Sequence, residues 1–154
     1  MSENKKIKNA TFVEYDNIKF RSKLELRMYK ELQSKGADFQ YEPFAITLED
    51  KFVSQVPFYI RKSSKKKKYG FTNVAPTTFR PITYTPDFVF KVDDKTILLE
   101  VKGFENNTYP LKRKLILKKL TELNNNGSNY VFAQVKTLNE LNELLKQLNY
   151  GITK

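Results

Sequence analysis

The chain has 154 residues, of which 28 are Lys or Arg and 17 are Asp or Glu, so its formal net charge is +11 at pH 7. It contains no cysteine and no histidine, which excludes disulfides, thiolate zinc sites, cysteine nucleophiles and imidazole bases. Any bound metal must therefore be held by oxygen ligands, which favours Mg²⁺, with Mn²⁺ as a substitute.

A chain of this length predicts one domain with its own core, and its basic charge predicts a polyanionic partner, most commonly nucleic acid. The plainer and less favoured interpretation of the charge alone is a basic protein that is merely soluble. The stretch from Met1 to Lys6 lacks the apolar core of a signal peptide, and no apolar run approaches the roughly 20 residues of a membrane span. These features predict a cytoplasmic protein without membrane contact, in which residues 1–10 form a flexible polar tail and residues 11–154 a single domain.

The first part of this domain predicts a short hairpin and a helix. Apolar residues alternate over residues 11–20 around Asp16-Asn17, a pattern that indicates two short strands and a turn. Ser22 and Glu25 then form a capping box, which opens a helix that Gly36 can end.

The middle of the chain predicts strands and a basic loop. Residues 39–48 and 52–61 have the composition of strands, with a turn at 49–51 and a proline in each strand that indicates an edge position. Residues 61–76 are expected to form a loop. Its first part, from Arg61 to Lys68, carries six cations and no apolar side chain.

The last part predicts a hairpin, two helices and a further strand. Residues 78–92 and 95–102 are expected to pair through a turn at Asp93-Asp94. A helix should follow and end near Asn126-Gly127. The order of elements predicts an α/β fold, a mixed sheet flanked by helices. The remaining expected features are the helix stripe Leu111, Leu115, Leu120 and Leu123, a strand at 129–135, and a last helix with Thr137 and Glu140 as its capping box.

Charged residues interrupt the apolar strands of this last hairpin. Asp87 opens one strand, and Glu100 and Lys102 lie two residues apart on the other, where side chains share a face. Among apolar neighbours such a pair is costly to bury without a cation or a tight salt bridge. The pattern predicts a divalent-metal site for phosphodiester hydrolysis. Lys102 would stabilise developing charge or help to deprotonate water, and Glu25 would add a carboxylate if its helix packs beside the hairpin.

The order of these residues resembles the PD-(D/E)XK nuclease superfamily, through Pro86-Asp87, Glu100-Val101-Lys102 and the upstream helical acid Glu25. A longer run, over about residues 14–120, is similar to small phage nuclease-like proteins and junction-resolving endonucleases. The segments that carry this similarity are Lys19 to Glu25, Asp87-Phe88, Val101-Lys102-Gly103 and Leu111 to Lys114.

The resemblance implies a restriction-endonuclease-like fold and a Mg²⁺-dependent DNA endonuclease that leaves a 5′-phosphate and a 3′-hydroxyl. It implies that Asp87 and Glu100 are metal ligands, that the backbone carbonyl of Val101 is an extra ligand, that Lys102 is the catalytic lysine and that Glu25 is an accessory acid. It also implies branched or junction DNA as a substrate class and a phage or mobile-element origin, hence the cytoplasm of a bacterial host cell. One site per domain means that cutting both strands needs a homodimer or two successive events.

Two groups of cations are candidate contacts to the DNA backbone: Lys65, Lys66, Lys67 and Lys68 in the loop, and Lys112, Arg113 and Lys114 on the helix.

Plainer interpretations stay open at this point. In these interpretations Glu25 would only close a capping box, and Asp87 would be a turn or strand-edge residue. Glu100 and Lys102 would form a surface ion pair, and the basic loop would be a solvated insertion. The corresponding rival functions are a catalytically silent nucleic-acid-binding module and a basic RNA-binding protein of unrelated fold. A small interaction adaptor would leave the charge unexplained.

Overall fold

The computed structural model describes residues 11–61 and 70–150, and the chain divides into two compact units. The first unit comprises Met1–Ala45 and Thr85–Lys154, and the second comprises Ile46–Tyr84. The tail expected at residues 1–10 and most of the cationic part of the expected basic loop lie outside the described residues.

The first unit is built on a mixed four-stranded sheet, so the fold is α/β as predicted. The outer strand β12 runs parallel to β11, whereas β10 is antiparallel to both β11 and β3. In spatial order the strands are β12 (Tyr130–Val135), β11 (Lys95–Val101), β10 (Phe88–Val92) and β3 (Phe39–Tyr41).

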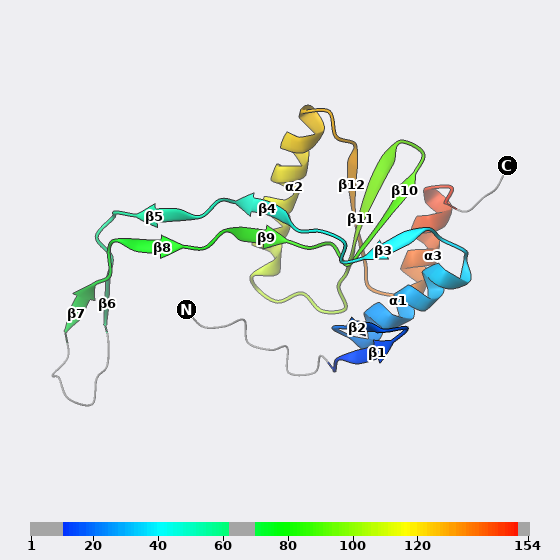
Figure 1. Cartoon of the computed structure of the whole chain (residues 1–154), viewed down its shortest axis with the longest axis horizontal. Helices are drawn as coiled ribbons and strands as arrows, with labels where there is room; N and C mark the ends of the chain where they lie inside the picture. The colour runs from blue at the N-terminus through cyan, green and yellow to red at the C-terminus, as the bar shows by residue number, and fades with distance from the viewer. Residues whose placement is uncertain (1–10, 62–69, 151–154) are drawn as a thin grey trace. The chain divides into compact units, whose positions relative to one another are not determined.

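Helices flank both faces of this sheet (Figure 1). Helices α1 (Lys23–Ser34) and α3 (Leu138–Gln147) lie on one face, and α2 (Tyr109–Asn125) packs on the other, beside β12. The main apolar core lies between the sheet and helices α1 and α3, because the buried side chains of these helices interleave with those of β10 and β11. Its fully buried members are Phe20, Met28, Leu32, Phe88, Ile97, Leu99 and Leu141.

Local sequence signals set the ends of the early elements as expected. The strands β1 (Val13–Tyr15) and β2 (Ile18–Phe20) pair through Asp16 and Asn17, both with positive φ (54° and 58°), a conformation that Asp and Asn tolerate in tight hairpin turns. Gly36 follows α1 with φ +66°, which confirms it as the residue that ends the helix.

The expected long strand over residues 78–92 is wrong, because prolines break it. The segment forms three pieces, β8 (Thr77–Phe79), β9 (Ile82–Tyr84) and β10, separated at Pro81 and Pro86. Proline lacks the N–H that a sheet interior requires. The turn that joins β10 to β11 is confirmed: Val92 pairs with Lys95, and the intervening Asp93 has φ 53°.

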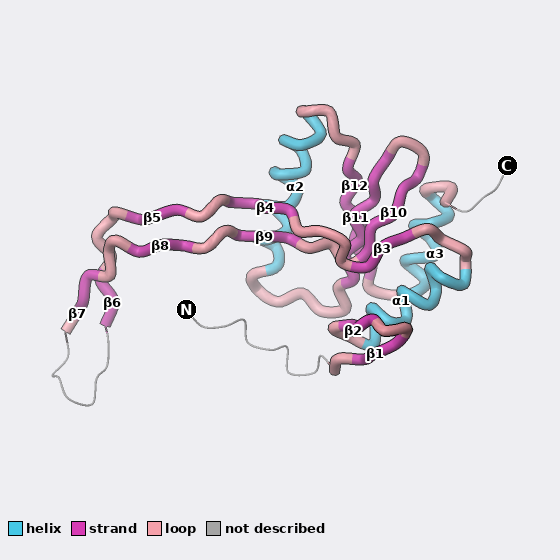
Figure 2. The backbone as a smooth tube through the Cα atoms, in the orientation of Figure 1, coloured by secondary structure: helices cyan, strands magenta, loops and turns pink. Residues whose placement is uncertain are grey.

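The second unit is a ribbon of three antiparallel strand pairs, shown as successive magenta pairs in Figure 2. Expected strands at 39–48 and 52–61 are each split around their proline. The turn expected at 49–51 is also wrong, because the chain continues along the ribbon there, with a register shift between Thr47 and Glu49. The pairs are β4 (Ile46–Glu49) with β9, β5 (Phe52–Ser54) with β8, and β6 (Tyr59–Arg61) with β7 (Phe71–Asn73).

The structure changes two predictions from the sequence, the extent of the basic loop and the buried face of α2. Phe71–Asn73, expected in the basic loop 61–76, form a strand paired with β6, whose last residue, Arg61, was expected both to end a strand and to begin this loop. In α2 the buried residues are Tyr109, Ile116 and Leu120, whereas Leu111, expected in the apolar stripe, is 64% exposed. No helix in the described part of the chain combines the length and apolar character needed to cross a membrane.

Candidate metal and catalytic site

The hairpin β10–β11 brings the two predicted metal ligands together. Phe88 pairs with Leu99, so Asp87 and Glu100 continue the two strands side by side at their shared end. Both residues are buried, with 8% and 9% of their surface exposed. Asp87 Oδ2 accepts a hydrogen bond of 2.6 Å from the backbone N–H of Val101. Asp87 is therefore fixed to the neighbouring strand directly beside Glu100, and it is more than a solvated turn residue.

Lys102, the residue that follows β11, completes this group. Its Nζ lies 3.9 Å from Glu100 Oε1 and 4.6 Å from the centroid of the Tyr109 ring. Because Glu100 is almost fully buried, the pair is not the exposed surface ion pair that the sequence left open. An ammonium and two carboxylates thus meet at one end of the sheet.

Burial makes this pair of acids electrostatically strained. Loss of solvent raises the pKa of Asp87 well above its usual range, and the negative charge of Glu100 raises it further. The Val101 N–H opposes this shift by stabilising the ionised form, and the carboxylates of Glu25 and Glu42 add to it. A buried carboxyl whose pKa is raised by neighbouring acids is typical of a site that holds a cation or performs acid–base chemistry.

Glu25 combines the two roles that the sequence left open. Ser22 caps α1 by accepting from the Glu25 N–H at 3.1 Å, and the Glu25 carboxylate accepts from the Arg21 N–H at 3.2 Å, so the capping interaction is confirmed. The same carboxylate accepts from the Tyr41 hydroxyl at 2.8 Å and lies close enough to Asp87 to raise its pKa. It borders the acidic pair while its hydrogen bonds are made to its own helix start and to β3.

A fourth acid, Glu42, was missed by the sequence reasoning. Its N–H donates to the carbonyl of Asp87 at 3.0 Å, and its carboxylate lies 2.9 Å from the Arg21 guanidinium. Burial raises the pKa of Glu42, and the positive charge of Arg21 opposes this increase. The signal was present as Glu42-Pro43: an acid at a strand end next to proline, as in Pro86-Asp87.

The donor set suits a divalent cation held by two carboxylates. No group of three or more acidic side chains placed to hold a metal is present within residues 11–61 and 70–150. Asp87 and Glu100 offer carboxylate oxygens, and the Val101 carbonyl is the further donor that the family resemblance implies. Mg²⁺ is commonly bound through one or two carboxylates, with water and substrate phosphate as its other ligands. The residues present therefore fit such an ion.

The structure separates the predicted DNA-contacting cations. Lys112 and Lys114 are exposed on α2, whereas Arg113 is half-buried and pairs with Glu105 at 3.1 Å. Lys65 to Lys68 lie outside the described residues. The sequence reasoning also missed Tyr109 and Gln134, which both contact Arg113. A glutamine in an otherwise apolar strand was the available sequence signal.

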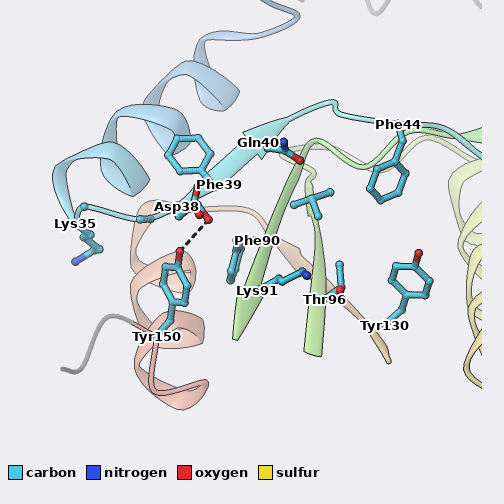
Figure 3. A pocket seen from close by; sticks show the side chains of 13 residues that line it. Lys35, Asp38, Phe39, Gln40, Phe44, Phe90, Lys91, Thr96, Tyr130 and Tyr150 are labelled. Atoms are coloured by element: carbon cyan, nitrogen blue, oxygen red, sulfur yellow. Dashed lines mark hydrogen bonds between the residues drawn. The ribbon is translucent and has the colours of Figure 1, made fainter. Parts of the chain in front are cut away.

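A separate cavity of about 790 Å³ opens in the first unit, and none of the predicted site residues is among the residues that line it. Figure 3 shows aromatic and polar side chains around it, including Phe44, Tyr130 and Lys91, and the hydrogen bond of 3.2 Å that Tyr150 donates to the carbonyl of Asp38. It is therefore distinct from the acidic pair.

Fold and site together define an α/β protein with a buried carboxylate pair and a lysine at one end of a mixed sheet. The chain belongs to the DUF1064 family, described as "Protein of unknown function", whose sequence pattern matches residues 5–136. No curated protein and no solved structure matches the chain significantly.

Proposed function

We propose that this protein is a metal-dependent DNA endonuclease. The observation that carries the proposal is the meeting of Asp87, Glu100 and Lys102 at one end of the β10–β11 hairpin, with both acids buried. Burying two carboxylates side by side is unfavourable, and a protein that only binds a polyanion gains nothing from placing them there. The net charge of +11 supports a nucleic-acid partner.

In this proposal Asp87 and Glu100 hold Mg²⁺, which Mn²⁺ can replace, with the Val101 carbonyl as a further ligand. When bound, the ion lowers the pKa of a water and neutralises charge that develops on the scissile phosphate. The Val101 N–H orients Asp87 and favours its ionised form, because it donates to Oδ2. Lys102 places a positive charge at the rim, where it stabilises the developing phosphate charge or orients the attacking water.

The proposed substrate is DNA, and the resemblance to junction-resolving nucleases points to branched DNA in a phage-infected or bacterial cell. The described part of each chain holds one such site, so cutting both strands would require a homodimer or two successive events. Lys112 and Lys114 are exposed on α2 and are proposed to contact the DNA backbone.

The test is a gel assay with labelled linear duplex, single-stranded DNA, four-way-junction DNA and RNA, in Mg²⁺, Mn²⁺ or EDTA. The wild-type protein should cut DNA with either ion and not in EDTA, and Lys102→Ala should abolish cutting while DNA binding remains. A matched control is Lys95→Ala, which removes an exposed lysine at the opposite end of β11 and should cut like the wild type.

Three other results would decide against the proposal. Tight DNA binding without cutting on every substrate would identify a catalytically silent binding module. Tight RNA binding without cutting, unaffected by Asp87→Ala, would identify an RNA-binding protein. Equal cutting by wild type and Lys102→Ala would show that any activity arises elsewhere.

A further inference from the structure

A second layer of side chains, from α2 and β12, lies behind Lys102. The Tyr109 ring is the nearest part of this layer, with its centroid 4.6 Å from Lys102 Nζ, and the ring is buried, with only 3% of the residue exposed. A cation at this distance is attracted to the face of an aromatic ring. The contact to Glu100, at 3.9 Å, is too long to fix the ammonium alone, so the ring is its second support.

Hydrogen bonds hold the ring in place. The Tyr109 hydroxyl donates to Gln134 Oε1 at 2.9 Å, and Gln134 Nε2 donates to Glu105 Oε1 at 2.7 Å. Gln134 is the β12 partner of Glu100 in the parallel ladder, so the network is anchored beside the acidic pair. Burial, and then the charge of Glu100, raise the pKa of Tyr109, which keeps its hydroxyl protonated as a donor.

Arg113 closes the network from the next turn of α2. Its Nη1 donates to Glu105 Oε1 at 3.1 Å and to Gln134 Oε1 at 3.2 Å, and its guanidinium carbon lies 5.4 Å from the centroid of the Tyr109 ring. The hydrogen bond from Gln134 lowers the pKa of Glu105, as does the charge of Arg113, so Glu105 stays ionised as an acceptor. Arg113 therefore serves this network, unlike its exposed neighbours Lys112 and Lys114.

We infer that Tyr109 is a positioning residue, whose ring holds the Lys102 ammonium beside Glu100 and whose own orientation is set by Gln134, Glu105 and Arg113. The inference rests on the proposed nuclease function, to which it adds the device that orients the lysine. A lysine side chain has four flexible methylene groups and a compact charge, so its position has to be imposed by its surroundings. Displacement of a catalytic group by about 1 Å costs on the order of 10²-fold in rate.

The experiment compares Tyr109→Leu, which removes the ring, with Tyr109→Phe, which keeps the ring and loses the hydrogen bond to Gln134. Tyr109→Leu should lower kcat in Mg²⁺ by about 10–100-fold. DNA affinity in EDTA should change less than about twofold, and Tm should stay above the assay temperature. Tyr109→Phe should retain most of kcat. Tyr150→Leu, which removes a tyrosine packed on Phe90 and absent from this network, is the matched control for reduced packing.

A kcat equal to that of the wild type in Tyr109→Leu would overturn the inference. A decrease in kcat that Tyr150→Leu reproduces, or that Tyr109→Phe shares fully, would overturn it as well.

If the wild-type protein itself cuts no DNA, the proposed function fails, and NMR then tests the positioning of Lys102 alone. Stacking on the ring should shift the side-chain resonances of Lys102 upfield in the wild type and in Tyr109→Phe, and the shift should vanish in Tyr109→Leu. Unshifted Lys102 resonances in the wild type would refute the stacking of Lys102 on the ring.

Discussion

At the scale of single residues, the main feature is the unfavourable placement of Asp87. Its carboxyl is nearly excluded from solvent and lies beside Glu100, with one N–H donor, from Val101, as partial compensation. Removing charge here should therefore stabilise the metal-free protein even though it destroys the proposed site. Such a trade between stability and activity is typical of functional acids.

The pH dependence of stability follows from the raised pKa of Asp87. Asp87 binds its proton more tightly in the folded state than in the unfolded chain. Protonation of Asp87 therefore stabilises the folded state, and this contribution is fully present below the ordinary carboxyl pKa and is lost as pH rises through the raised value. In EDTA at neutral pH, Asp87→Asn should therefore melt a few degrees above the wild type, at about 2–4 °C for each kcal/mol gained. Circular dichroism melts at neutral and acidic pH measure the difference, which should shrink in acid.

The matched control for that variant is Asp93→Asn, an exposed acid in the turn of the same hairpin, which should melt like the wild type at both pH values. Addition of Mg²⁺ should raise Tm of the wild type and leave Asp87→Asn unchanged, because the proposed metal site needs both carboxylates. A wild type more stable than Asp87→Asn in EDTA at neutral pH would contradict the electrostatic argument.

Glu25 provides a separate test, since its capping and acidic roles are separable. Glu25→Gln keeps an oxygen acceptor for the Arg21 N–H and the Tyr41 hydroxyl but removes the charge beside Asp87. Its Tm should stay close to that of the wild type while the rate of DNA cleavage falls. Glu25→Ala, in contrast, should lose about 0.5–2 kcal/mol of stability through the missing cap. Unchanged cleavage by Glu25→Gln would reduce the residue to a helix cap.

At the scale of elements, the chain separates a packed layer structure from a thin ribbon. The main core cluster draws every one of its buried side chains from the first unit. The ribbon has little core of its own: Phe52 stacks on Phe79 at 5.0 Å between ring centroids, yet Phe52 and Phe71 remain exposed. A two-stranded ribbon contributes little independent stability.

Deletion of the ribbon tests this division. Ile46 and Tyr84 are paired residues of β4 and β9, so a two-residue Asn-Gly turn can join them in place of residues 47–83. The shortened protein should unfold cooperatively, since the core is intact, and it should keep metal-dependent cutting because Asp87, Glu100 and Lys102 remain. Thermal unfolding and the gel assay measure both properties. A chain without a cooperative transition would show that the first unit needs the ribbon to fold.

At the scale of the whole molecule, the excess of positive charge should govern the proposed association with DNA. Each neutralised phosphate releases condensed counterions, so the logarithm of the binding constant should fall linearly with the logarithm of salt concentration. The formal charge of +11 thus predicts strongly salt-dependent DNA binding, with branched substrates distinguished mainly by shape and phosphate position.

Neutralising Lys65 to Lys68 with serine should weaken DNA binding and reduce the salt slope by about 0.9 for each phosphate that the protein no longer neutralises. Fluorescence anisotropy titrations at several salt concentrations measure the slope. An unchanged slope would identify the lysine run as a solvated insertion. The control variant neutralises four exposed lysines elsewhere and should alter the slope less: Lys30, Lys35, Lys91 and Lys95.

The sequence by itself determined the α/β class, most of the helix ends and three of the four acids that meet at the site, Glu25, Asp87 and Glu100. These properties depend on local chemistry: Ser22 and Gly36 mark the ends of α1 by capping and by a left-handed turn, and the apolar periods of 2 and 3.6 residues distinguish strand from helix. Asp87 and Glu100 stood out because charge inside an apolar strand requires an explanation wherever the strand lies.

Only the tertiary structure decided which of these side chains meet. The register Phe88 to Leu99 sets Asp87 beside Glu100, and the packing of α1 and β3 adds Glu25 and Glu42. The continuous ribbon and the contact between Lys102 and Tyr109 likewise depend on partners distant in sequence. Local patterns report what each residue prefers, whereas burial and electrostatic coupling depend on neighbours that only the folded chain supplies.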